Sequence, residues 1–162
     1  MLVECVPNFS EGRDKAVVDA LAAAADSVPG AALLDVHMDP DHNRCVLTIA
    51  GHGKAVSDAA FRAAEVAVQK IDMTQHQGVH PCIGAVDVVP FVPLGNTPLE
   101  DCVAMATAFA ARLANDLELP TYLYAAAAAQ WTPDRKSLAW LRKPGFEGLV
   151  PALNSKERKP DV

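Results

Sequence analysis

A short connection between two strand-like segments limits the folds open to this chain. Ala31–His37 and Arg44–Ala50 both have the composition of strands, and the polar turn Asp39–Asn43 joins them. A parallel crossover needs roughly a dozen connecting residues or more, so the two strands are predicted to form an antiparallel hairpin. A doubly wound parallel sheet is therefore the less favoured architecture.

A strand and a helix are predicted on each side of this hairpin. Before it, Leu2–Val6 is predicted as a strand and Arg13–Ser27 as a helix with apolar residues at helical spacing. After it, a long helix with an apolar stripe from Val56 to Ile71 precedes a buried strand at Ala85–Val92. The order β-α-β-β-α-β is typical of the ferredoxin-like split βαβ arrangement. We therefore expect an α+β fold with the helices on one face of the sheet.

A C-terminal extension of helices and a short strand is expected to follow. Thr97–Glu100 has the form of a capping box with proline at the first helical position, and Leu119-Pro120 closes the helix that it starts. We place one domain at residues 1–154 and treat residues 155–162 as a charged tail or linker. The remaining segments are predicted as an apolar strand, a helix or tightly packed connector, and a final helix: Thr121–Tyr124, Ala125–Ala129 and Arg135–Leu141.

The composition is typical of a soluble globular domain. Of its 162 residues, 51% are hydrophobic and 21% charged, with a formal net charge of −6. No cluster of Lys and Arg suited to a nucleic acid backbone is visible, and neither is a secretory signal or an apolar run of the roughly 20 residues that span a bilayer. The four cysteines include no CxxC pair and are expected to be free thiols. We therefore expect a cytoplasmic protein whose partner is a small molecule or another protein, not a membrane or a nucleic acid.

The segment Asp72–Pro93 places a polar loop directly before an apolar strand. Pro81 fixes its own φ and biases His80 toward an extended conformation, while Gly78 and Gly84 permit conformations closed to other residues. The His80 side chain can gain or lose a proton near neutral pH. We therefore predict that His80 is a general acid or base, and the alternative is a hydrogen-bonded structural histidine.

Two patterns have some features of a metal site. Asp72, His76 and His80 would share one face of a helix, but the glycine and proline near His80 disfavour that helix. The turn Asp39–Asn43 begins like a calcium loop, yet it lacks the glycine and the closing glutamate of such loops. We therefore expect no metal site.

Three separated motifs cover nearly the whole chain in order. They are VECVPNFSEG at 3–12, LLDVHMDPDHNR at 33–44 and the segment 72–93. Together they resemble the N-terminal subdomain of glutamate formiminotransferase, the transferase part of formiminotransferase-cyclodeaminase. That family moves a formimino group between N-formimino-L-glutamate and tetrahydrofolate, in histidine degradation and one-carbon metabolism. The resemblance implies this activity, with tetrahydrofolate as co-substrate and no metal.

The resemblance implies that His80 is the catalytic histidine, which takes a proton from the attacking amine and returns one to the leaving nitrogen. Asn8, Asp39, Arg44 and Gly84 are the candidate substrate-binding residues. The guanidinium of Arg44 can hold a carboxylate by two parallel hydrogen bonds, and the amide of Asn8 can donate or accept. The structural alternatives are an Asx turn for Asn8 and a local ion pair with Asp39 or Asp41 for Arg44.

The chain departs from the family pattern in three ways. Cys82 stands where many members have an arginine after the His-Pro pair, and His37 stands where vertebrate members have an aspartate. Third, the chain corresponds to only one of the two subdomains of the family's transferase unit, which has its substrates in a tunnel between them. We therefore expect this chain to work with a second formiminotransferase subdomain or as a homo-oligomer. The alternative function is a non-catalytic module that binds folate, an amino acid or a protein and retains the fold.

Overall fold

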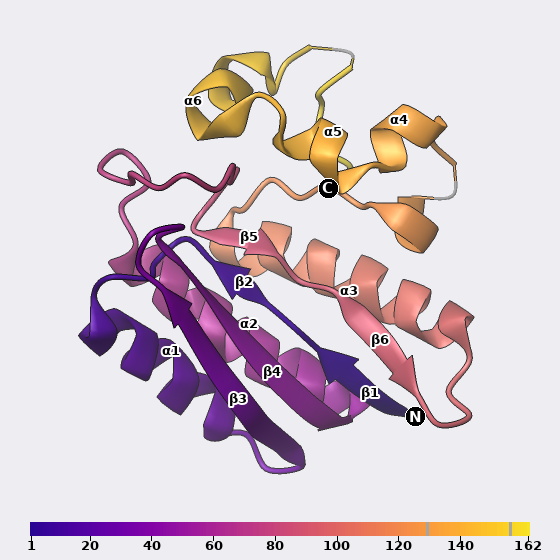
Figure 1. Ribbon diagram of the computed structural model, residues 1–162. Helices are drawn as coiled ribbons and strands as arrows, with labels where there is room; N and C mark the ends of the chain where they lie inside the picture. The colour runs from indigo at the N-terminus through magenta and orange to yellow at the C-terminus, as the bar shows by residue number, and fades with distance from the viewer. Residues whose placement is uncertain (129, 156) are drawn as a thin grey trace.

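An antiparallel sheet lies at the centre of the molecule. The computed structural model describes residues 1–128, 130–155 and 157–162. Within these ranges every strand pairing is antiparallel, and the sheet twists across one side of the domain (Figure 1). The strands are β1 (Leu2–Cys5), β2 (Asn8–Phe9), β3 (Ala31–Asp39), β4 (Arg44–His52), β5 (Val86–Val88) and β6 (Phe91–Leu94).

At two positions in the sheet, two short strands follow one another along the same line, and we call each such pair a path. The strand order is β5-β2-β4-β1-β6, with β3 on the outer side of β4. β1 and β2 follow one another along β4 with Pro7 between them, and β5 and β6 follow one another on the other side with Pro90 between them. Proline has no N–H to donate to a neighbouring strand, so a break at a proline costs the sheet little. The β1–β2 path and β4 are therefore central, while β3 and the β5–β6 path lie at the edges.

The antiparallel hairpin predicted from the short turn is confirmed. β3 and β4 pair from Ala31 opposite Gly51 to Asp39 opposite Arg44. Both strands run two residues further than predicted, to Asp39 and His52. Asn43, the last residue of the turn, has a φ of 49°, a left-handed conformation that asparagine tolerates better than most residues.

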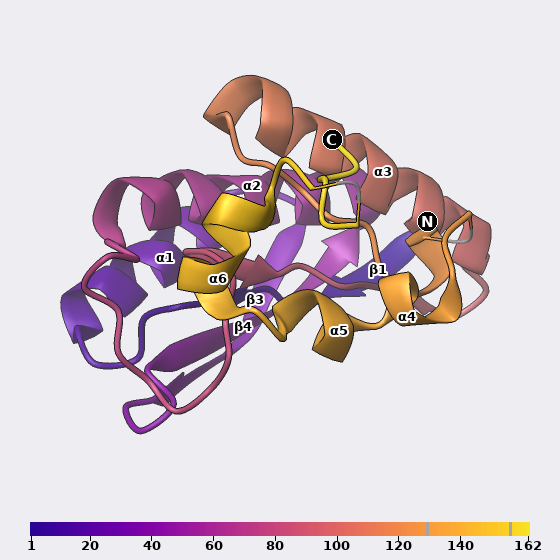
Figure 2. The same ribbon diagram turned by 90° about the horizontal axis from the view of Figure 1, so that it is seen from above.

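One face of the sheet is covered by α1 (Lys15–Asp26) and α2 (Gly53–Lys70), which lie side by side behind it (Figures 1 and 2). Asp14 caps α1, because its carboxylate accepts the N–H groups at the start of the helix. α2 begins directly after β4. The buried residues of α2, which packs on both the sheet and α1, are mostly small, and they include Val56, Ala59, Ala60, Ala63, Ala64 and Ala67.

The long helix α3 (Leu99–Leu117) packs beside β6 through an edge-to-face contact of Phe91 and Phe109. The capping box predicted at its start is wrong. The hydroxyl of Thr97 donates to the carbonyl of Leu2 at 2.8 Å and accepts the Leu2 N–H at 3.0 Å, so it binds β1 rather than the helix. Pro98 occupies the cap position without a side-chain hydrogen bond.

The strand predicted as one buried segment at Ala85–Val92 is two short strands at an edge. The pairing breaks at Val89 and Pro90, and the chain resumes as β6. Most side chains of this path are half-buried, Val92 is exposed, and Asp87 is the residue that is buried. An edge path pairs on one side only, so continuous apolar sequence did not guarantee burial on both faces.

The C-terminal residues form a cap of short helices above the β5–β6 edge (Figure 1). The predicted strand Thr121–Tyr124 is irregular, because the backbone of Thr121 bonds instead to Asp161 and Val162. Ala129, within the alanine run, lies outside the described residues. The cap contains the 3₁₀ helices Ala125–Ala128 and Val150–Ala152 and the helices α4 (Pro133–Lys136), α5 (Leu138–Arg142) and α6 (Gly145–Leu149).

The single helix predicted at Arg135–Leu141 is therefore divided between α4 and α5. Ser137 separates them with an extended backbone, and its hydroxyl accepts the Trp140 N–H to cap α5.

Across the described ranges, no helix combines the length and apolar character needed to cross a bilayer.

Residues 157–162 pack on the cap instead of extending away from it. The Asp161 carboxylate accepts hydrogen bonds from the Leu123 N–H, the Trp131 indole and the Arg135 guanidinium at 2.6–2.8 Å. Arg135 and Asp161 are each 6% exposed, so this ion pair is buried. The guanidinium of Arg158 stacks 3.5 Å from the Trp140 ring centroid. The division of the chain at residue 154 into a domain and a linker stays a prediction.

Replacing Asp161 by Ala should destabilise the protein strongly. Arg135 would then be a buried charge without its partner, a loss that costs about 3–5 kcal/mol. Urea unfolding followed by circular dichroism measures this free energy. Asp19→Ala, which removes the exposed pair with Lys15, is the control and should change stability little. Equal effects of the two substitutions would show that the Asp161 pair does not anchor the cap.

Candidate active site

The face of the sheet opposite α1 and α2 carries several of the predicted site residues. Cys45, Leu47 and Ile49 point toward the helices, so Arg44 and Val46 lie on the other face. Residues directly opposite in an antiparallel pair share a face. Asn8 and His37 are both opposite Val46, and Asp39 is opposite Arg44. Asn8, His37, Asp39 and Arg44 therefore lie on one face, although His37 is exposed.

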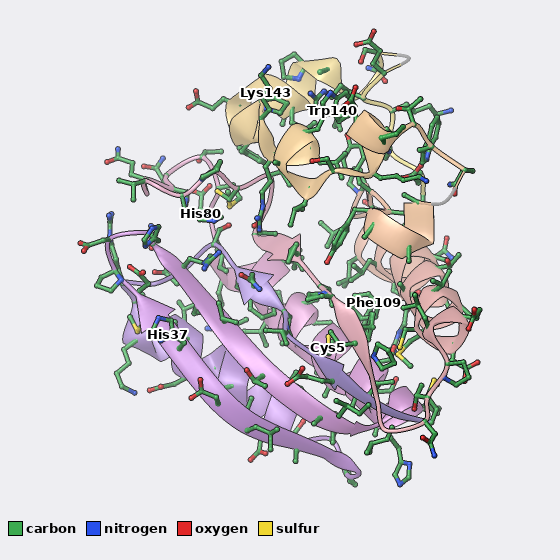
Figure 3. The ribbon with its side chains drawn as sticks, turned by 45° about the vertical axis from the view of Figure 1, so that its right-hand side comes forward. Cys5, His37, His80, Phe109, Trp140 and Lys143 are labelled. Atoms are coloured by element: carbon green, nitrogen blue, oxygen red, sulfur yellow. The ribbon has the colours of Figure 1, made fainter. Side chains whose placement is uncertain are left out.

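The loop with His80 passes the hairpin turn and lies between the sheet and the C-terminal segment that carries Trp140 and Lys143 (Figure 3). The Asn43 amide donates to the Gln77 carbonyl at 3.1 Å, and the Val79 N–H reaches the Asp41 carbonyl at 3.5 Å. These contacts hold the loop against the turn.

Two glycines allow this close packing around the turn. A Cβ at Gly78 would lie 2.4 Å from the His42 carbonyl oxygen, and one at Gly12 would lie 2.2 Å from that of Asp39. The reason given for Gly78 and Gly84 from the sequence, backbone conformations closed to other residues, is wrong, because neither has a positive φ. Gly78 is needed for space. Gly84 has room for a side chain, and its carbonyl accepts the Ser10 hydroxyl at 2.7 Å.

The hairpin brings Arg44 to His80. The Nη1 atom of Arg44 lies 3.1 Å from Nε2 of His80. Because arginine can only donate, Nε2 accepts this hydrogen bond and the neutral imidazole carries its proton on Nδ1. Nδ1 is buried and has no hydrogen-bond partner among the described residues. The ring of His42 stands edge-on at 5.9 Å between centroids.

The environment of His80 favours its neutral form. Burial lowers the pKa of His80 below its ordinary value of 6.5, and the nearby charges of Arg44 and Arg142 lower it further. The carboxylate of Asp87 and the nearby backbone of Pro81 oppose this shift only in part. A neutral imidazole at neutral pH is able to accept a proton, as a general base must.

Asp39 shapes the turn rather than pairing with Arg44. One carboxylate oxygen lies 2.6 Å from Nδ1 of His42, and the other accepts the N–H groups of Asp41 and His42 at 3.0 Å. The His42 hydrogen bonds are the main reason why the pKa of Asp39 is lowered. Among the described residues, the Arg44 guanidinium makes no ion pair with an acid, so the local ion pair considered for it is absent.

Asn8 is mostly buried, and its amide donates to the Val6 carbonyl at 2.8 Å. This bond runs back along the chain, whereas in an Asx turn the side-chain oxygen accepts from a later N–H. The amide oxygen of Asn8 takes part in no hydrogen bond within the described ranges. A structural bond therefore occupies one N–H of the Asn8 amide and leaves its oxygen as an acceptor for another group.

Two residues near His80 were not identified from the sequence. Asp87 lies on β5, and Arg142 ends α5. Asp87 and Arg142 form an ion pair, and both act on the charge state of His80. Their wide separation in the chain left no local pattern to detect.

Cys82, the other residue noted for its departure from the family pattern, lies beside the Ser10 hydroxyl. Burial raises the pKa of the Cys82 thiol, so it remains protonated and uncharged at neutral pH. Among the described residues, no group of three or more His, Cys, Asp or Glu side chains is placed to hold a metal ion.

Comparison with known proteins gives consistent matches. The family described as "Formiminotransferase domain, N-terminal subdomain" matches residues 2–162. Glutamate formimidoyltransferases of Thermoplasma acidophilum and Streptococcus pyogenes serotype M1 are 47% and 43% identical over 162 and 160 residues. The match covers 99% of this chain and 53% of each of these two relatives. The formimidoyltransferase-cyclodeaminase of Mus musculus is 46% identical, again over 99% of this chain but 29% of the relative.

The chain thus spans about half the length of the glutamate formimidoyltransferases that it matches. The match nonetheless includes both segments that meet at the Arg44–His80 contact. The chain therefore belongs to the formiminotransferase family, of which it forms an N-terminal subdomain.

Proposed function

We propose that this chain supplies the catalytic-histidine half of a glutamate formiminotransferase. The reaction would move a formimino group from N-formimino-L-glutamate to tetrahydrofolate, which is a co-substrate rather than a bound cofactor. The contact between Arg44 and His80 carries the proposal, because a guanidinium, which can bind a carboxylate, lies against a half-buried imidazole whose pKa is lowered. The names of relatives matched over 99% of this chain support the same reaction.

His80 would move one proton twice in this reaction. Its neutral Nε2 takes a proton from the attacking amine of tetrahydrofolate while a bond forms between that nitrogen and the formimino carbon. The imidazolium then returns the proton to the glutamate nitrogen as its bond to the same carbon breaks. General acid–base help of this kind contributes roughly 10²–10⁴-fold to a rate.

Arg44 would have two positions in the cycle. Without substrate it donates to Nε2 of His80, the nitrogen that acts as the base. A substrate carboxylate is a stronger partner, because it carries charge and accepts two parallel hydrogen bonds from a guanidinium. Binding of the carboxylate would therefore draw Arg44 away and free Nε2 for catalysis. Asp39 and Asn8 lie on the same face of the sheet, where their remaining acceptors could meet the substrate.

We also propose a ferredoxin-like split βαβ arrangement for this subdomain. Its support is the strand order, in which β4 lies between β3 and the β1–β2 path and every described pairing is antiparallel. A second formiminotransferase subdomain, or a second copy of this chain, would complete the site over the open face. A cytoplasmic location stays a prediction, and the free state of all four cysteines is consistent with it.

A non-catalytic binding module is the second candidate. The observation in its favour is Cys82, which remains neutral where many family members carry an arginine. The environment of His80 weighs against a binding module, because such a module has no need of an imidazole kept neutral by burial and by a neighbouring cation.

Substitution of His80 by Asn should remove transfer activity while the fold survives. In the enzyme that also carries the second subdomain, we expect a loss of roughly 10²–10⁴-fold in kcat. The melting temperature should change little, because contacts other than those of His80 hold the loop on the turn. The parent enzyme should lose activity only as pH falls through a pKa below 6.5, since the working form of His80 is unprotonated. Unchanged activity in His80→Asn would remove the histidine from the mechanism.

Replacement of Arg44 by Lys tests its role as the carboxylate anchor. Lysine keeps the charge but has no planar fork, so the KM for N-formimino-L-glutamate should rise. Arg62→Lys, in an exposed ion pair on α2, is the matched control and should leave KM as it is. Equal KM values in parent and Arg44→Lys would show that the guanidinium binds no substrate.

The described chain by itself should fold but bind folate weakly. Its core is of a size that supports an independent domain. Without the second subdomain, however, one side of the site is open and the reacting groups remain in water. Calorimetric titration with 5-formyltetrahydrofolate, with and without a separately produced second subdomain, measures the difference. Tight binding and full turnover by this chain alone would contradict a site formed between two subdomains.

A further inference from the structure

Asp87 is a buried acid on a short edge strand. Its side chain is 1% exposed. The pairing of β2 with β5 passes from Asn8 opposite Val88 to Phe9 opposite Val86, so the register shifts around Asp87. A bulge of this kind turns one residue out of the regular alternation. A carboxylate held away from water in this way is costly unless charged or polar partners meet it.

The partners of Asp87 connect the His80 loop with the C-terminal cap. One carboxylate oxygen accepts the N–H of Ile83, three residues after His80, at 3.0 Å. The other oxygen accepts a hydrogen bond from the guanidinium of Arg142, at the end of α5. The Arg142 side chain is 13% exposed, so solvent screens the pair little. Asp87 therefore fixes the loop to β5 and to α5 together.

Charged groups from three elements act on His80. Arg44 on β4 and Arg142 on α5 lower the pKa of the imidazole, whereas Asp87 on β5 raises it. The other titratable groups nearby are His42, edge-on at 5.9 Å and bound to the Asp39 carboxylate, and the protonated thiol of Cys82. Asp87 and Arg142 are thus paired with one another and have opposite effects on the same histidine.

We propose that Asp87 and Arg142 are positioning residues for His80, which fix the segment that follows it and set the balance of charge around its imidazole. The proposal rests on the proposed function, in which His80 is the acid–base group. Neither residue is required to touch substrate. Arg142 helps to keep Nε2 of His80 unprotonated and able to act as a base, and Asp87 holds Arg142 in place while limiting its effect.

Titration of His80 by NMR tests this directly in the ¹⁵N-histidine-labelled protein. The His80→Asn variant assigns the signal. Arg142→Met removes the cation and should move the pKa of His80 upward. Asp87→Asn keeps an acceptor for the Ile83 N–H but removes the anion, and should move it downward. If Asp87 and Arg142 had only a structural role, both variants would lower stability, but the pKa of His80 would not move in opposite directions in the two.

The ion pair of Arg135 and Asp161 provides a matched control. It lies in the same cap and is as well buried, with 6% exposure on each side chain. Arg135→Met should lower stability, yet it should leave the titration of His80 where it is in the parent. If Arg135→Met moves the titration as far as Arg142→Met does, the effect comes from loosening of the cap and the proposal is wrong.

The double variant Asp87→Asn, Arg142→Met keeps the test decisive if a single variant fails to fold. Removal of both charges leaves no buried ion without its partner, a replacement that proteins often tolerate. The pKa of His80 should move upward in the double variant, but less than in Arg142→Met. The reason is that Arg142 affects this pKa more than Asp87 does. A titration identical to that of the parent in every folded variant would overturn the proposal.

Kinetics separate the proposal from the function on which it rests. In the enzyme with its second subdomain, Arg142→Met should lower kcat at neutral pH and move the acid limb of the pH profile upward, with KM for N-formimino-L-glutamate unchanged. If the NMR titrations move as expected but His80→Asn retains full activity, the proposed function fails while the charge coupling stands. If His80→Asn is inactive but the titrations of the pair variants do not move, the positioning role alone fails.

Discussion

Burial of one face of the central strands determines the rest of this structure. Along β4, Cys45, Leu47 and Ile49 are covered completely by α1 and α2, and strand side chains alternate between faces. A slip of one residue would turn these apolar side chains to the open face, so the register of β4 is strongly specified. Arg44 lies on the open face for this reason. The position of this candidate site residue is therefore determined by apolar residues on the opposite face of the strand.

The site also depends on how closely polypeptide backbones approach one another at the hairpin turn. Asn43 connects three segments, since its side chain accepts the Gly12 N–H at 2.9 Å and donates to the Gln77 carbonyl at 3.1 Å. The turn, the segment after β2 and the loop with His80 are thereby held as one unit. Arg44 and His80 belong to two parts of this unit, so their contact is a product of backbone packing as much as of the attraction between their side chains.

The sequence was informative where a few neighbouring residues decide the structure. The strand composition of Arg44–Ala50, the helical spacing in α1 and the short turn at Asp39–Asn43 each predict the observed element. Distant partners could not be predicted in this way. The Thr97 hydroxyl binds Leu2 across 95 positions instead of capping a helix, and Asp87 meets Arg142 across 55. Sequence patterns contain the local preference of a residue but not the competing partner that the fold brings to it.

The close backbone packing around the turn Asp39–Asn43 affects how the tolerance of this protein to substitution should be interpreted. Gly12 and Gly78 approach the turn from two sides, and a side chain at either position would overlap backbone atoms of Asp39, His42 or Arg44. Both positions would therefore be as intolerant in a mutational scan as a residue that takes part in chemistry. Such a scan would assign two glycines to the binding site although they contribute only the absence of a side chain. Intolerance around this turn thus measures how little space separates the backbones, and only a substitution that preserves shape while changing charge or hydrogen bonding can identify a chemical role.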